Sequence, residues 1–213
     1  MNLEIIRDIF QIVFYATAST VACIGLWKWR EELKGKVEYE AAKQALAKAY
    51  SVRDQIRMIQ SAIVFPSEWA GYESAEYETE RQRKVNESFF AYSQRFQKLQ
   101  DKVSELYPAM VEAEAVFGDE AREKLDELIA MTRRLWAAIV VHHQGLDQGR
   151  QNHQVAYRKF FNIINGINEF ETPDMGTDEE PVDDDNFKRD LDAAMQEIKE
   201  YFSPMLGRNH PRL

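Results

Sequence analysis

Apolar residues are continuous near the start of the chain, whereas in the rest of the chain they recur at helical spacing. Positions 9 to 27 are 19 residues without a formal charge. A helix of that length measures about 28 Å, close to the ~30 Å hydrocarbon core of a bilayer. The run ends in Trp27, Lys28, Trp29 and Arg30, aromatic and cationic side chains typical of the lipid–water boundary. The pattern predicts an N-terminal transmembrane anchor, flanks included, over residues 1–30.

The charges that flank this segment predict its orientation. Residues 1–8 contain one basic side chain, Arg7, and residues 28–36 contain four. The positive-inside rule then places the N-terminus outside and residues 31–213 in the cytoplasm. A cleaved signal peptide, a lipoprotein site at Cys23 and a soluble core helix are the alternatives. The first two fit poorly, because the N-terminal flank is not net basic and the apolar run continues past Cys23.

One face of the predicted anchor is lined by small and polar residues. These are Gln11, Tyr15, Ala18, Ala22 and Gly25, at helical steps of three and four, with Ser19 beside them. Small residues let two membrane helices approach closely, and a glutamine in hydrocarbon requires a hydrogen-bond partner. We therefore expect this face to pack against a second copy or another membrane subunit. The alternative is that small residues are simply common in membrane helices.

The remaining sequence predicts four amphipathic helices. Their apolar stripes are Tyr39, Ala42, Leu46, Ala49, Ile56, Ile59 and Ile63; then Val85, Phe89, Tyr92, Phe96, Leu99, Val103 and Leu106, continued by Met110, Ala113 and Phe117; then Ala121, Leu125, Leu128, Leu135 and Ile139, widened by Trp136 and Val140; and finally Phe187, Leu191, Ala194, Ile198 and Phe202. We expect an all-α fold in which the anchor precedes an antiparallel bundle of about four helices over 31–213. An acidic segment, 171–186, interrupts the bundle.

Glycine and proline positions predict where these helices begin, bend and end. The first bundle helix should begin past Gly35 and end near Pro66, because proline lacks the backbone N–H that continues a helix. Pro108 should kink the second helix without ending it. Gly118 suits the position after that helix, and Asp119 suits the cap of the next.

Composition and residue spacing exclude several classes of chemistry. The net charge of −9 argues against a nucleic-acid binder, and a single cysteine allows neither an internal disulfide nor a cysteine-based zinc site. No glycine-rich phosphate-binding motif is present. We therefore expect no cofactor, no metal and no enzymatic activity.

Three groups of polar side chains are the weak candidates for chemistry. His142 and His143 are adjacent and diverge by about 100° on a helix, and His153 has no fixed relation to them. The carboxylates Glu120, Glu123 and Glu127 share a helix face without a histidine in register. Positions 183–186 lack the alternating ligands of a calcium loop and better suit the cap of the last helix.

Three stretches resemble a group of small bacterial membrane proteins with a single N-terminal anchor. The first is the run Trp27-Lys28-Trp29-Arg30-Glu31-Glu32-Leu33 that closes the apolar helix; the second consists of 39–43 with 49–57, and the third is 116–121. The resemblance covers most of the chain. It implies the bacterial inner membrane and carries over no functional residues.

The sequence thus favours a membrane-tethered helical interaction protein that acts through an unknown cytoplasmic protein partner. An oligomeric membrane effector or pore-forming subunit, assembled through the anchor, is the first alternative. A hydrolase that uses the histidines is the second. Aromatic residues in 146–170 serve either a docking patch or, more simply, the core.

Overall fold

The computed structural model describes residues 3–61, 64–147, 163–164 and 187–207. Within these ranges the regular elements are helical. They are α1 (Leu3–Ile59), the short 3-10 helix η1 (Pro66–Glu68), α2 (Glu80–Phe117), α3 (Asp119–Asp147) and α5 (Phe187–Gly207). The predicted all-α fold, with a candidate membrane helix followed by a bundle, is confirmed.

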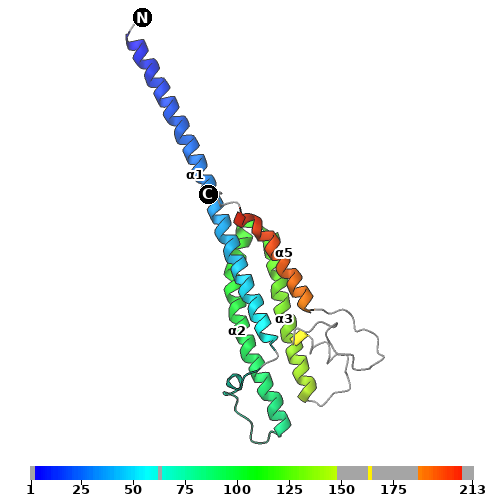
Figure 1. Ribbon diagram of the computed structural model, residues 1–213. Helices are drawn as coiled ribbons and strands as arrows, with labels where there is room; N and C mark the ends of the chain where they lie inside the picture. Colours follow the sequence, from blue (N-terminus) through cyan, green and yellow to red (C-terminus); the bar gives the residue numbers. More distant parts are fainter. Residues whose placement is uncertain (1–2, 62–63, 148–162, 165–186, 208–213) are drawn as a thin grey trace, which may run out of the picture.

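Helix α1 is continuous and serves two environments. Its first half projects alone from the bundle, and its second half is one of the bundle's four helices (Figure 1). The predicted boundary past Gly35 is therefore wrong, because a single glycine costs a helix interior only about 1 kcal/mol. The helix also ends at Ile59, earlier than the predicted end near Pro66.

Four helix segments form the bundle in an up-down-up-down arrangement (Figure 1). Helix α1 packs against α2 and α5, and α3 packs against α2 and α5, so each helix has two antiparallel neighbours. Two ion pairs show the register: Lys48 of α1 with Glu105 of α2 at 2.7 Å, and Arg57 of α1 with Asp192 of α5 at 2.8 Å.

The predicted stripes supply most of the core. All five predicted residues of α5 are buried, and so are the five that define α3. In α2 the stripe is buried from Phe96 to Ala113 but only half-buried at Val85, Phe89, Tyr92 and Phe117. On α1 the core face consists of alanines at the end nearer the projecting segment and of larger side chains at the other. The sequence of buried residues is Ala41, Ala42, Ala45, Ala49, Val52, Ile56 and Ile59.

Several predictions fall outside the described residues. These include Ile63, His153, most of the aromatic stretch 146–170, and the acidic segment 171–186 with its proposed cap. Within the stretch 146–170, Ile163 and Ile164 are described, and both are buried in the core. Pro108 and Pro204 both lie inside helices, so neither proline ends its helix.

Two local signals fix the ends of α2. Thr79 caps its start: the Gln82 N–H donates to the Thr79 hydroxyl at 3.3 Å, and the Gln82 side chain accepts from the Thr79 N–H at 3.1 Å. This reciprocal pair satisfies two otherwise unpaired donors. At the other end Gly118 alone connects α2 to α3, so Asp119 is already helical and is not the cap that we predicted.

Gly118 adopts φ +88° and ψ −174°, a conformation that is essentially confined to glycine. An added Cβ would meet nothing within 4 Å, so the cost of a substitution is conformational and not steric. We expect Gly118→Ala to destabilise the bundle by about 1–3 kcal/mol. Thermal unfolding followed by circular dichroism measures this loss. Gly207→Ala is the matched control, because Gly207 also has open space around it but has no positive φ.

Candidate functional site

The projecting half of α1 is the most unusual surface of the molecule. Its apolar side chains are not covered: Phe10 is 73 % exposed, Phe14 is 68 % exposed and Leu26 is 64 % exposed. None of its most apolar 18-residue window is buried, and this is the helix among the described residues that is long and apolar enough to cross a membrane. Such a surface is unfavourable in water by about 25 cal/mol per Å².

The predicted packing residues lie together on this exposed segment. Gln11, Tyr15, Ala18, Ser19, Ala22 and Gly25 are all exposed. The Gln11 amide donates to the Tyr15 hydroxyl at 3.4 Å, a long bond one helical turn away. No atom lies within 4 Å of a Cβ placed on Gly25, so this face is open to a neighbour.

The residues predicted to lie at the lipid–water boundary follow directly on the same helix. Trp27 and Trp29 are 65 % and 60 % exposed, and Lys28 and Arg30 are exposed between and beyond them. Aromatic rings and cations thus encircle the helix where its apolar run ends.

The continuity of α1 fixes how the packing face is oriented relative to the bundle. At about 100° per residue, the line through Gln11, Ala22 and Trp29 lies roughly 150° around the axis from the buried face centred on Ala45 and Ile56. The packing face therefore points away from the bundle. Sequence inspection missed this relation because it treated the two segments as separate helices.

Within the described residues, His142 and His143 are not part of a cluster that could hold a metal ion. His143 stacks on the ring of Phe89 with centroids 4.1 Å apart, between α2 and α3. Burial, and then the charge of neighbouring His143, lowers the pKa of His142. Among the described residues no three His, Cys, Asp or Glu side chains gather as a metal site would require. His153 lies outside the described residues.

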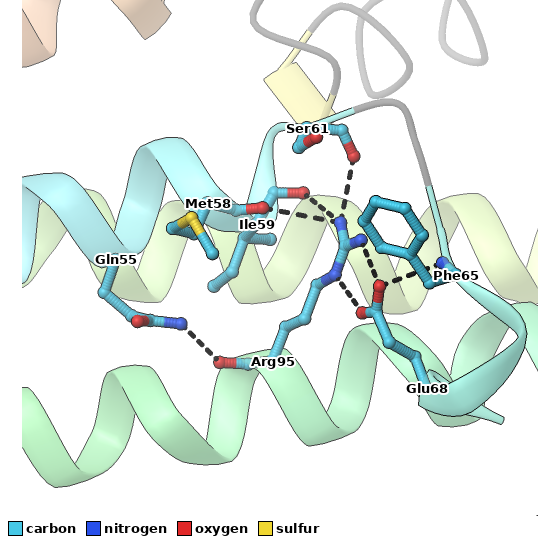
Figure 2. Close-up of polar contacts among 7 residues, drawn as sticks. All are labelled: Gln55, Met58, Ile59, Ser61, Phe65, Glu68 and Arg95. Atoms are coloured by element: carbon cyan, nitrogen blue, oxygen red, sulfur yellow. Dashed lines mark hydrogen bonds and ion pairs between the residues drawn. The ribbon is translucent and has the colours of Figure 1, made fainter. Parts of the chain in front are cut away.

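Arg95 forms a buried polar cluster that was not predicted (Figure 2). It lies on α2 and is 8 % exposed. Its guanidinium donates to the Glu68 carboxylate at 2.8 Å and to three carbonyls at the end of α1, of Met58 at 3.4 Å, Ile59 at 3.3 Å and Ser61 at 2.9 Å. Helix ends leave carbonyls without partners, so Arg95 satisfies groups that α1 cannot.

Glu68 holds this cluster to the connection between α1 and α2. Its carboxylate also accepts from the backbone N–H of Phe65 at 3.0 Å. The hydrogen bonds from Arg95 are the main reason that the pKa of Glu68 falls from 4.5 to about 2. One signal in the sequence marks Arg95: it lies three residues after Tyr92 and four before Leu99, in the register of the core stripe. The arrangement is that of a structural clasp, in which one side chain joins α2 to the end of α1 and to η1.

Comparison with known proteins adds no further constraint. No protein-family model matches the chain, and neither a curated protein nor a solved structure shows significant similarity to it. The class defined by the fold is an all-α protein with one N-terminal helix long enough to span a membrane, followed by a helical bundle.

Proposed function

We propose that the chain is a membrane-tethered helical interaction protein, with its bundle presented to protein partners at the cytoplasmic face of a bacterial inner membrane. The observation that carries the proposal is the continuity of α1, whose exposed apolar half runs without interruption into the core of the bundle. The cytoplasmic placement rests on the basic residues after the apolar run, and the bacterial membrane rests on the sequence resemblance. Tethering raises the effective concentration of two proteins that share a membrane.

In this proposal the bundle lies close to the membrane surface, and the register of the helices supports that position. Lys48 of α1 pairs with Glu105 of α2. Because the two helices are antiparallel, Gly35, thirteen residues before Lys48, pairs in height with Gly118, thirteen residues after Glu105. The turn at Gly118 is therefore level with Gly35, about 9 Å along α1 from Trp29. A folded partner does not fit into so short a gap. We infer that partners approach the sides of the bundle.

Those sides are charged, which suits reversible contacts with proteins more than insertion into lipid. Cross-helix ion pairs line them, including Lys124 with Glu197 at 2.6 Å and Arg134 with Asp190 at 2.9 Å. These side chains are partly exposed, at 28 % and 49 % for the first pair and 31 % and 32 % for the second, so a partner can reach them from the sides.

A charge placed at the middle of the apolar segment tests the tether. Arginine at the centre of a membrane helix costs about 2.5–3.5 kcal/mol, so we expect Val21→Arg to shift partition toward water by roughly a hundredfold. Carbonate-washed membrane pellets measure the shift. Gln44→Arg, an exposed position past the apolar run, is the matched control and should leave the pellet fraction unchanged.

The proposal fails if the unaltered chain stays in the supernatant without detergent. It also fails on orientation if a cysteine at exposed Ser104, in a Cys23→Ser background, reacts with an impermeant maleimide in intact cells. Where both tests are passed, cross-linking from the sides of the bundle followed by mass spectrometry identifies the partner.

A further inference from the structure

We propose that two copies of the chain pair in parallel through the outward face of α1, which runs from Gln11 to Glu40 through Tyr15, Ala22, Trp29 and Leu33. This inference rests on the proposed anchoring in a membrane. Beyond that anchoring, it names a binding partner, which is a second copy of the chain, and the surface that binds it, which is the outward face of α1. The packing face predicted within the apolar run and its continuation from Trp29 to Glu40 then serve the same contact between two copies.

Lipid alone does not satisfy this face. Leu33 is 43 % exposed and lies about 6 Å past Trp29, where the helix has left the hydrocarbon. At the other end, the Gln11 amide has one long bond to Tyr15, and hydrocarbon offers no partner to its carbonyl oxygen. A partner that covers the whole outward face must therefore be apolar near Leu33 and polar near Gln11.

A second copy meets both requirements at matching depths. In a parallel pair each Gln11 meets the other Gln11, and an amide is both donor and acceptor. The charges past Trp29 are also complementary across the pair. Lys36 and Glu40 lie one helical turn apart on this face, so each Lys36 lies near the Glu40 of the second copy. Within one chain the Glu40 carboxylate lies 3.6 Å from the Lys43 ammonium, and the Glu40 side chain remains 44 % exposed.

The orientation of the bundle permits this pairing. Because the outward face lies roughly 150° from the buried face of α1, two paired helices carry their bundles on opposite sides of the pair. Ala18, Ala22 and Gly25 let the helix axes approach to about 8 Å. The pair is symmetric and closed, so it stops at two copies.

Disulfide formation between neighbouring positions tests the face. Ala22 lies on it, whereas native Cys23 lies about 100° further round and Thr20 lies on the opposite side. Full-length protein in native membranes is oxidised as Ala22→Cys in a Cys23→Ser background, as the unaltered chain, and as Thr20→Cys in the same background. Disulfide bonds need Cα atoms within about 7 Å, so we expect Ala22→Cys to form at least about tenfold more dimer than either control.

A charge exchange provides an independent readout. Lys36→Glu should reduce the Ala22→Cys dimer, because each new glutamate faces the Glu40 of the other copy. Adding Glu40→Lys should restore it. Pairing is overturned if the three cysteine positions cross-link equally, or if none does in pelleted protein. Absence from the pellet overturns the anchor instead, so the two failures are distinguishable.

Discussion

Arg95→Met should destabilise the bundle by about 3–5 kcal/mol, the usual cost of removing one partner from a buried ion pair. The loss has two sources. Glu68 would keep a negative charge in a partly buried site, and the carbonyls of Ile59 and Ser61 would lose the Arg95 donor, whereas the Met58 carbonyl would keep the Ser61 N–H at 3.3 Å. For a chain of this length the change corresponds to a fall in melting temperature of roughly 10 °C. Circular dichroism of the full chain in detergent micelles measures it.

Two companion variants separate the clasp from a general effect of losing an arginine. Arg122→Met removes the 2.7 Å pair with Glu114, whose side chains are 46 % and 30 % exposed, and should cost less than about 1 kcal/mol. Adding Glu68→Met to Arg95→Met removes the stranded charge and should recover part of the loss. A cost of Arg95→Met no larger than that of Arg122→Met would contradict the role given to the clasp.

The pH dependence of this loss has a definite sign. The pKa of Glu68 is lowered from 4.5 to about 2 in the folded chain, chiefly by the hydrogen bonds from Arg95. Its contribution to stability is therefore complete above pH 4.5 and disappears as pH falls toward 2. The difference in melting temperature between the unaltered chain and Arg95→Met should shrink over that interval.

The helices were predictable because their information is local. In α5, five apolar residues at steps of four and three identified the core face, and all five are buried. The unbroken apolar run before Trp27 likewise identified the segment that the structure leaves uncovered. Periodicity of this kind depends only on the geometry of one helix.

What could not be predicted depends on contacts between elements. The end of α1 at Ile59 is set with the help of Arg95, which approaches from a helix about forty residues away in the sequence. The angle between the outward and buried faces of α1 could not be predicted from the sequence, because it depends on the helix continuing through Gly35. Once the helix is known to be continuous, the two faces follow from residue numbers alone.

Phe202→Ala should destabilise the bundle by about 3–5 kcal/mol, because it empties a large buried position. Phe202 is fully buried and meets the ring of Phe117 edge to face, with centroids 5.8 Å apart. The Arg57–Asp192 pair shows the register of α5 on α1, in which Phe202 is level with the stretch between Ala45 and Ala49. The large ring thus fills the space that the small residues of α1 leave.

Phe202→Leu retains most of the volume and should recover most of the stability that Phe202→Ala loses. Tyr107→Ala removes an aromatic ring that is 46 % exposed, and its cost should be much smaller because the ring lies mostly outside the core. Thermal unfolding in micelles compares the three variants. Equal costs for Phe202→Ala and Tyr107→Ala would mean that α5 does not seal the alanine-rich end of the bundle.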